Sequence, residues 1–363
     1  MSKNDCNLSS KEIEVRRRQN LKEKPADDDL TFGRTFTDHM FVMEYSGEKG
    51  WYDPRIEPYS SFSVDPAASF CHYGQMTFEG MKAYRGESGE ALLFRPRKNG
   101  ERFNNSNERM CIPQMDPDFF VKAVKKLVKV DKDWIPEKEG TALYIRPFVI
   151  ATESYLGLKP ADEFKFFIIA SPVGPYYPEG LKPTQILVET EYVRSVKGGT
   201  GFAKTGGNYA GSLKAQTRAR KKGYNGVLWL DACERKYIEE VGTMNVFFRI
   251  DDTIITPELG ETILPGITRA SVLELLRDWN EEIEERKLAI EEVYSAYQEG
   301  KLQEIFGTGT AAVIAPIGKL SWEDKDIKLD EEEPGQLTRE IYDCLYGIQR
   351  GRVEDKFGWT VEV

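Results

Sequence analysis

A stretch rich in proline and glycine near the middle of the chain divides the sequence into two parts. Residues 171–183 read SPVGPYYPEGLKP, with four prolines and two glycines in thirteen residues. Both residue types interrupt regular structure, so this stretch predicts a linker. The chain has 363 residues, enough for two domains of about 100–200 residues each. The sequence therefore predicts a polar N-terminal tail at 1–29, a small domain at 30–172, an interdomain loop at 173–183 and a large domain at 184–363.

Both parts alternate strand-like runs with stretches of helical character. Runs rich in Val, Ile, Phe and Tyr predict strands at 91–95, 141–150, 164–171, 184–190, 226–231, 244–250, 253–256 and 311–315. Helical spacing of apolar residues, or a helix-compatible run, predicts helices at 117–130, 208–222, 267–279 and 335–349. The sequence therefore predicts an α/β (α+β) chain of two domains.

The charge and hydropathy of the chain narrow the classes of partner. Lys and Arg number 50 and Asp and Glu number 60, which gives a formal net charge of −10. A surface this acidic repels phosphate backbones, so we expect no nucleic-acid partner. No apolar run approaches the roughly 18 residues that a membrane helix needs, so we expect no membrane partner.

The cysteines and histidines restrict the chemistry. Five cysteines, none of them in a CxxC pair, fit reduced thiols better than a disulfide framework. The N-terminus lacks the apolar core of a secretory signal, and its acidic residues argue against a mitochondrial presequence, so we expect a cytoplasmic protein. His39 and His72 are the only histidines, which removes most metal and triad chemistry, and we predict no metal site.

Glycines surround a single lysine in KGGTGFAKTGGNY, residues 197–209. Glycine lets a backbone approach a ligand closely, and Asn208 can cap a following helix whose N-terminus would favour an anion. Composition alone supports equally a loop that binds a ligand and a flexible loop in which Lys204 is solvated. The phosphate-binding P-loop GxxxxGK[ST] is a sharper alternative, but it fails because Ala203 stands where a glycine is required.

Two charged residues lie within or beside apolar stretches. Glu240 stands just before the apolar run 244–250, and Arg146 lies between Tyr144 and Phe148, which share its face by strand alternation. A buried carboxylate is costly without a positive partner, and a guanidinium stays charged and needs an anion. The simpler alternatives are an edge glutamate that faces solvent and an arginine in a structural salt bridge.

Two turns offer backbone N–H groups to an anion. FGTGTAA, at 306–312, supplies them together with the hydroxyls of Thr308 and Thr310 and leads into a strand. LPGITR, at 264–269, is a turn followed by the start of a helix. Each turn is a weak signal when taken alone.

Taken in order, these stretches resemble one known family. The segments FGRTFTDHM, HYGQMTFEGMKAYRG, LYIRPF, GGTGFAKTGGNYAGSL, VLWLD, EEVGTMN, LPGITR and FGTGTA are similar to those of branched-chain amino acid aminotransferases of the bacterial type. These are fold type IV enzymes that depend on pyridoxal 5′-phosphate. The resemblance runs from about residue 30 to the C-terminal WTVEV. It implies two α/β domains with the cofactor at their interface, a proline-rich interdomain loop and a homodimer.

The resemblance also implies a role for each matched residue at the cofactor. Lys204 matches the catalytic lysine that forms a Schiff base with it. Tyr209 matches the tyrosine that hydrogen-bonds its phenolic oxygen, and Glu240 matches the carboxylate on its pyridine nitrogen. The matched phosphate-binding positions are Arg102, Thr243, Ile267, Thr268 and Thr310.

At the substrate, the resemblance implies an apolar pocket that contains one cation. Tyr73, Phe78 and Tyr144 match the pocket walls. Arg146 matches the arginine that receives the acidic co-substrate. Thr310 and Ala311 match the turn that offers amides to the substrate carboxylate. The implied reaction moves an amino group between L-leucine, L-isoleucine or L-valine and 2-oxoglutarate by ping-pong kinetics. One methylene is worth only about 1–3 kcal/mol in such a pocket, so we expect overlapping activity on all three.

One feature departs from the mammalian members of this family. They carry a redox-sensitive CxxC just after the GTA turn, whereas Ala312 and Ala315 stand at those places here. Thiol control of that kind is therefore not expected.

Two alternatives remain to be tested. A D-amino acid aminotransferase or an aminodeoxychorismate lyase would share the fold and the spacing of Lys204 and Glu240, although the N-terminal motifs argue against both. A protein that binds a nucleotide without catalysis is of a different class, and Ala203 argues against it. Assays with L- and D-leucine distinguish a branched-chain aminotransferase from these two enzymes. The colour of the purified protein and its binding of ATP test for the nucleotide-binding protein.

Overall fold

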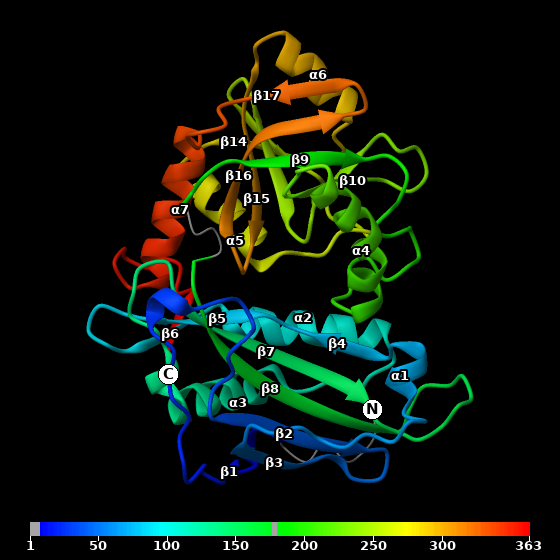
Figure 1. Cartoon of the computed structure of the whole chain (residues 1–363), viewed down its shortest axis with the longest axis vertical. Helices are drawn as coiled ribbons and strands as arrows, with labels where there is room; N and C mark the ends of the chain where they lie inside the picture. The colour runs from blue at the N-terminus through cyan, green and yellow to red at the C-terminus, as the bar shows by residue number, and fades with distance from the viewer. Residues whose placement is uncertain (1–7, 176–179) are drawn as a thin grey trace. The chain divides into compact units, whose positions relative to one another are not determined.

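The computed structural model describes residues 8–175 and 180–363, and the chain divides into two compact units (Figure 1). The first unit comprises Met1–Tyr176, Ala203–Gly206 and Gly347–Val363, and the second comprises Tyr177–Phe202 and Gly207–Tyr346. Lys204 thus belongs to the first unit although it comes from the middle of the sequence. Residues 1–7 of the predicted tail and 176–179 of the predicted interdomain loop lie outside the described residues.

One sheet organises the described part of the first unit, with strand order β1-β3-β2-β8-β7-β5-β6-β18 and β4 paired to β7. Its strands are β1 (Glu14–Val15), β2 (His39–Ser46), β3 (Gly50–Pro58), β4 (Met76–Phe78), β5 (Met81–Arg85), β6 (Ala91–Phe94), β7 (Ala142–Ala151), β8 (Glu163–Val173) and β18 (Thr360–Glu362). Its helices are α1 (Ser69–Tyr73), α2 (Pro96–Arg109) and α3 (Pro117–Val130), with short 3-10 turns at Leu8–Ser10, Asp27–Asp29 and Lys132–Trp134. Strands β7 and β8 pair antiparallel from Ala142↔Val173 to Ala151↔Phe164, because both are long runs of apolar residues suited to a sheet.

Helices α2 and α3 pack on one face of this sheet. Phe103 of α2 and Phe120 of α3 are fully buried and both contact the ring of Phe166 on β8. Side chains alternate along a strand, so Tyr144 and Arg146 point to the face opposite the core residues of β7. The fold therefore holds these two side chains on the sheet face away from the two helices.

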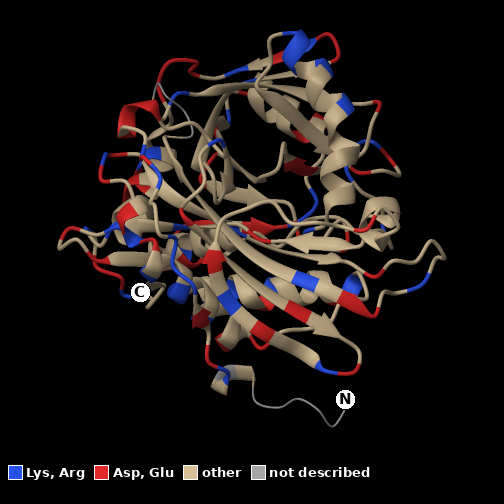
Figure 2. Cartoon of the chain, turned by 60° about the horizontal axis from the view of Figure 1, so that its bottom comes forward, with Lys and Arg blue, Asp and Glu red and all other residues tan. Residues whose placement is uncertain are grey.

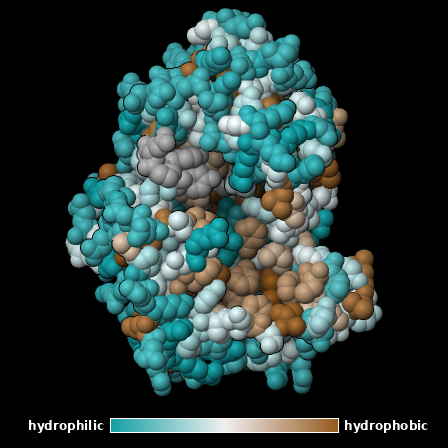
Figure 3. Space-filling model, viewed as in Figure 1, coloured by the Kyte–Doolittle hydropathy of each residue, from teal (hydrophilic) through white to brown (hydrophobic). Residues whose placement is uncertain are grey.

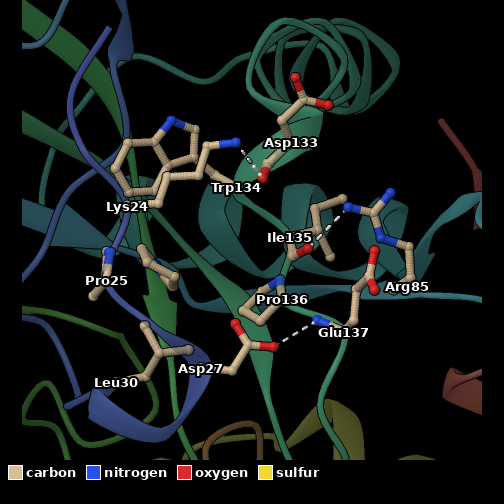
Figure 4. Close-up of a pocket in the computed structure, with 11 residues that line it drawn as sticks. Lys24, Pro25, Asp27, Leu30, Arg85, Asp133, Trp134, Ile135, Pro136 and Glu137 are labelled. Atoms are coloured by element: carbon tan, nitrogen blue, oxygen red, sulfur yellow. Dashed lines mark hydrogen bonds between the residues drawn. The ribbon is translucent and has the colours of Figure 1, made fainter.

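The N-terminal segment lies along the first unit (Figure 4). Strand β1 pairs parallel to β3. Further on, Lys24 Nζ donates to the carbonyl of Asp133 at 2.9 Å, and Asp27 accepts the backbone N–H of Glu137 at 3.1 Å. These residues line a pocket of about 290 Å³ in the first unit. The described part of the predicted polar tail is therefore held along the first unit by one strand pairing and by hydrogen bonds, although most of its residues are exposed.

A second sheet organises the described part of the second unit, with strand order β11-β10-β9-β16-β15-β12-β13-β14 and β17 paired to β16. Its strands are β9 (Thr184–Glu189), β10 (Gly226–Leu230), β11 (Ile238–Val241), β12 (Asn245–Ile250), β13 (Thr253–Thr256), β14 (Glu282–Glu285), β15 (Leu302–Gly309), β16 (Val313–Trp322) and β17 (Lys325–Lys328). The helices are α4 (Gly206–Lys221), α5 (Ile267–Asp278), α6 (Ile290–Gln298) and α7 (Gln336–Gln349). The stacked rings of Phe247 and Phe306 join β12 to β15.

Most predicted elements are present, with three differences. The turn expected at 306–312 is shorter, because residues up to Gly309 continue β15 and only the next three form a turn. The strand expected at 311–315 therefore starts at Val313. Asn208 does not begin the helix that follows the lysine: α4 starts at Gly206, and the Asn208 side chain exchanges two hydrogen bonds of 2.7 Å with Thr200.

The described residues contain no helix long and apolar enough to cross a membrane. Acidic and basic side chains are interspersed over both units (Figure 2). The net charge of −10 is therefore spread over the chain rather than confined to one segment.

Candidate functional site

In the first unit, Lys204 is fixed against β4 and α2. Its backbone N–H donates to the hydroxyl of Ser106 at 2.9 Å, and its carbonyl accepts the N–H of Phe78 at 3.0 Å. Its Nζ lies over the Phe78 ring, 4.7 Å from the centroid. Two predicted site residues, Lys204 and Phe78, are therefore in contact, and the flexible-loop alternative for Lys204 is wrong.

Arg102, on α2, forms a buried pair with Glu79. Its Nε and Nη2 donate to the two carboxylate oxygens at 2.8 and 2.9 Å, and Asn99 donates to the same carboxylate at 2.8 Å. Burial works to raise the pKa of Glu79, but the charge and hydrogen bonds of Arg102, with help from Lys204 and Asn99, hold that pKa below its usual value. Glu79 therefore stays ionised and fixes the plane of the guanidinium.

Arg146 and Tyr144 lie side by side on β7, as strand alternation predicts. Arg146 Nη2 donates to the Tyr144 hydroxyl at 2.9 Å, and its Cζ lies 4.8 Å from the ring centroid of Phe78. Arg146 Nε is buried without a hydrogen-bond partner in the described chain. Within the described ranges Arg146 has no carboxylate partner, so it is not the structural salt bridge considered as an alternative. Tyr73, at the end of α1, instead donates its hydroxyl to the carbonyl of Leu156.

In the second unit, Tyr209 on α4, Glu240 on β11 and Thr243 in the following turn line one small pocket. The Glu240 side chain is only 4% exposed, so the alternative of a glutamate facing solvent is wrong. Its Oε1 accepts the backbone N–H of Leu264 at 2.7 Å and lies 3.1 Å from Nη2 of Arg194, which lines the same pocket. The carboxylate thus has the positive partner that its burial requires.

The start of α5 and the turn after β15 supply N–H groups and hydroxyls in the same unit. Helix α5 begins at Ile267, followed by Thr268, and the turn holds Thr310 and Ala311. A Cβ on Gly266 would meet Asn245 Oδ1 at 2.0 Å, so a larger residue there would displace the Asn245 side chain.

Thr308 carries a buried hydroxyl without a hydrogen-bond partner. The residue is 2% exposed, and its Oγ1 makes no hydrogen bond within the described chain. Its register partner across β12 and β15, Asn245, donates to the carbonyl of Leu264, three residues before the first residue of α5. An orphaned buried hydroxyl is expensive unless a ligand satisfies it. Thr308 therefore points to a ligand group near this part of the second unit.

Within the described ranges, no three His, Cys, Asp or Glu side chains lie together in a way that could hold a metal ion. In the part of the chain that the structure describes, Cys71, Cys111 and Cys233 are exposed thiols that form no disulfide.

A model of the family described as Amino-transferase class IV matches residues 76–320. The chain belongs to the class IV aminotransferases. Relatives support this over almost the whole chain: Branched-chain-amino-acid aminotransferase 2 of Bacillus subtilis (strain 168) is 56% identical, covering 98% of each chain.

Solved structures of class IV aminotransferases share the fold. The branched-chain aminotransferase of Thermoproteus uzoniensis with norvaline has a TM-score of 0.74 at 26% identity, covering 89% of this chain and 99% of that one. The T.th. branched-chain amino acid aminotransferase with pyridoxamine 5′-phosphate has a TM-score of 0.72 at 25% identity, covering 88% and 97%. The predicted α/β fold of type IV and the predicted enzyme class are confirmed.

Two buried residues that contact predicted site residues were not themselves predicted from the sequence: Glu79, beside Arg102 in the first unit, and Arg194, beside Glu240 in the second. Glu79 could have been predicted, because it lies within the largely apolar run MTFEGMKAY and a buried carboxylate needs a cation. The same reasoning was applied to Glu240. Arg194 could not have been predicted in this way, since the segment EYVRSVKGG is polar on both sides. Only the folded chain shows that its side chain is 8% exposed.

Proposed function

We propose that this class IV aminotransferase moves the amino group between L-leucine, L-isoleucine or L-valine and 2-oxoglutarate, with pyridoxal 5′-phosphate as cofactor. The observation that carries the substrate class is the 56% identity, over 98% of both chains, to a relative named for that activity. The pyridoxamine 5′-phosphate in a solved structure at 25% identity supports the cofactor.

The donor set of the described residues fits this cofactor. Its pyridine nitrogen needs an anion, and the buried carboxylate of Glu240 is one. Its phosphate needs donors, which the N-terminus of α5 and the orphaned hydroxyl of Thr308 can supply. Its aldehyde carbon needs an amine, and Lys204 carries one in a fixed backbone segment. Each chemical requirement is therefore met by a residue of the chain.

Lys204 is the catalytic residue in this proposal. When bound, pyridoxal 5′-phosphate supplies the electron sink that stabilises negative charge at the substrate α-carbon. Lys204 Nζ would hold the cofactor when no substrate is bound. With substrate bound, the neutral Lys204 amine would take a proton from the substrate α-carbon and deliver it to the C4′ carbon of the cofactor. Because the amino group is stored between two half-reactions, the kinetics are ping-pong.

The other proposed cofactor residues bind and orient. Glu240 keeps a proton on the pyridine nitrogen, and Tyr209 donates its hydroxyl to the phenolic oxygen. Both line one pocket with Thr243, which supports the assignment. The phosphate-binding residues in the proposal are Arg102, Thr243, Ile267, Thr268 and Thr310.

The proposed substrate pocket combines aromatic walls with one cation. Tyr73, Phe78 and Tyr144 form the walls, and Thr310 and Ala311 offer amides to the substrate carboxylate. Arg146 receives the distal carboxylate of glutamate or 2-oxoglutarate. The proposal is supported by the position of its guanidinium, which lies against the rings of Phe78 and Tyr144 and has no carboxylate partner within the described ranges.

We also propose a homodimer in the cytoplasm. Apolar side chains of the loop after β7 are exposed: Tyr155 by 46%, Leu156 by 64% and Leu158 by 84%. On the face drawn in Figure 3, brown side chains gather mainly over the unit that contains β7. A second copy of the chain would cover them. Sedimentation equilibrium that gives the mass of a single chain would refute the dimer, and Leu156→Ser should weaken it.

The decisive experiment is an assay of the purified protein with a panel of L-amino acids, D-leucine and 2-oxoglutarate. We expect a yellow protein whose colour is bleached by borohydride, with activity on the three branched-chain L-amino acids. Lys204→Ala should lose turnover and keep its fold, as measured by circular dichroism. Activity on D-leucine instead would favour a D-amino acid aminotransferase, and a colourless protein that binds ATP would refute the proposal.

A further inference from the structure

Arg194 lies where three segments of the second unit meet. It follows β9, and its side chain is 8% exposed. Its Nη2 donates to the carbonyl of Gly201 at 2.8 Å and to the carbonyl of Thr262 at 2.6 Å, and lies 3.1 Å from Glu240 Oε1. One nitrogen thus contacts the glycine-rich segment that leads to Lys204, the loop that leads to α5, and the buried carboxylate.

The packing around Arg194 leaves little room for adjustment. A Cβ on Gly201 would lie 2.5 Å from the carbonyl oxygen of Thr262 and 2.6 Å from Ser195 Oγ. Ser195 donates to that same carbonyl at 2.7 Å. The glycine is therefore required for the close approach of these segments, and the position of the guanidinium is fixed by backbone atoms rather than by flexible side chains.

Two contacts of Glu240 meet at one of its oxygens. Oε1 faces Arg194 and accepts the N–H of Leu264 at 2.7 Å. Because both groups approach the same oxygen from fixed positions, they orient the carboxylate. A buried carboxylate without a cation would take up a proton, since desolvation penalises its charged form. The guanidinium of Arg194, itself buried, is the cation placed to prevent this.

The neighbouring Glu239 does not take this role from Glu240. Burial raises the pKa of Glu239, with Glu240 adding to the effect, although Thr262 and Arg194 oppose it. Its Oε2 is buried without a hydrogen-bond partner in the described chain. Glu239 is thus pushed toward its neutral form, which leaves the charge of Arg194 to be balanced by Glu240.

We propose that Arg194 is a positioning residue that keeps Glu240 ionised and directs its carboxylate toward the pyridine nitrogen of the cofactor. The inference rests on the proposed function, because it needs a cofactor with a basic ring nitrogen. It adds a residue to the site: Arg194 contacts no reacting atom and acts through Glu240.

The test compares Arg194→Met and Arg194→Lys with a matched arginine. Arg218 also pairs with a buried glutamate of the second unit, with Nη2 2.5 Å from Glu189 Oε1, so Arg218→Met removes a similar ion pair elsewhere. We expect Arg194→Met to weaken pyridoxal 5′-phosphate binding and lower kcat by about ten- to a hundredfold, the range for losing a hydrogen bond to a charged group. KM for leucine should change by less than about threefold. Arg194→Lys should restore part of the loss, and Arg218→Met should keep the wild-type kcat and affinity for pyridoxal 5′-phosphate.

A double-mutant cycle shows whether Arg194 acts through Glu240. In a Glu240→Gln background the carboxylate is absent, so Arg194→Met should add little to the loss of cofactor affinity, measured by equilibrium dialysis. Equal losses in both backgrounds would overturn the inference, as would wild-type affinity and kcat in Arg194→Met. If Arg194→Met alone does not fold, the cycle is run with Arg194→Lys, which keeps the charge. A wild-type protein that binds no pyridoxal 5′-phosphate would instead refute the proposed function.

Discussion

Replacing Arg146 with methionine tests how one pocket accepts both an apolar and an acidic substrate. Methionine keeps much of the length of the side chain and removes the charge. An unpaired carboxylate is expensive to bury, so the glutamate side chain needs the guanidinium, whereas the leucine side chain needs only the aromatic walls. We therefore expect the glutamate half-reaction to suffer and the leucine half-reaction to change little.

The structure sets the size of the effect. Losing a hydrogen bond between the guanidinium and a substrate carboxylate costs about 1.5–3 kcal/mol, or roughly ten- to a hundredfold in kcat/KM for glutamate. The cost to stability has a separate source, and the lost contacts together are worth about 1.5–3.5 kcal/mol. Arg146 gives up one hydrogen bond of 2.9 Å to Tyr144 and its contacts with two rings, worth about 0.5–1.5 and 0.5–1 kcal/mol each. No buried carboxylate within the described ranges loses its partner.

Single-turnover measurements of the two half-reactions, followed by the absorbance of the bound cofactor, check this prediction. Arg55→Met is the matched control: Arg55, on β3 of the same sheet, pairs with Glu57 at 2.9 Å and Asp53 at 2.7 Å, and its loss should leave both half-reactions unchanged. Parallel losses for glutamate and leucine in Arg146→Met would refute the reasoning and give Arg146 a structural role.

Three further predictions concern buried polar groups. Glu79→Gln should lower the free energy of unfolding at pH 7 by about 3–5 kcal/mol, because Arg102 loses its anion. The folded pKa of Glu79 lies below its usual 4.5, so the stability difference between the variant and the wild type, measured by urea titration, should shrink as the pH falls through that folded value. An equal difference at every pH would contradict this prediction. Burial lowers the pKa of Lys82 to about 8 from 10.5. The stability of Lys82→Met relative to the wild type should therefore fall by about 3 kcal/mol between pH 7 and pH 11, because only the wild type loses a buried charge over that range; a difference that does not change with pH would contradict this. Thr308→Val should not destabilise the cofactor-free protein, because within the described residues the hydroxyl has no hydrogen bond to lose. It should weaken pyridoxal 5′-phosphate binding by about two- to tenfold. Unchanged affinity in equilibrium dialysis would exclude the hydroxyl from the phosphate site.

Elements with a strong apolar pattern could be predicted from the sequence. The helix expected at 117–130 is α3, and the strand expected at 253–256 is β13, with the same bounds. Helix α2 was not predicted, because Pro96–Arg109 is mostly polar and carries a glycine. Its polar residues are buried because they bind other polar groups: Arg102 and Asn99 hold Glu79. Hydropathy patterns record burial against apolar surface and miss burial of this kind.

The same reason limits what could be predicted of the site. Lys204 and Glu240 lie in segments whose composition already marks them, and the resemblance assigned their roles. The position of Arg194 depends on a nearby segment, around Gly201, and on two that are distant in sequence, around Glu240 and Thr262. The orphaned state of the Thr308 hydroxyl is likewise visible only after all neighbouring donors and acceptors have been placed. Such features belong to the tertiary structure and have no local signature.

Each unit contains one buried arginine–glutamate pair among the residues proposed to bind the cofactor, and the two pairs are used in opposite ways. In the first unit Arg102 is the proposed ligand and Glu79 holds it; in the second, Glu240 is the proposed ligand and Arg194 holds it. A buried ion pair stabilises a fold no better than well-packed apolar residues of similar volume. Stability alone therefore does not explain why both pairs are present. In each unit the partner orients the proposed ligand: Glu79 fixes the plane of the Arg102 guanidinium, which is charged in any case, and Arg194 holds and directs the Glu240 carboxylate. Each proposed ligand thus presents a charge of fixed sign and direction, which well-packed apolar residues could not supply.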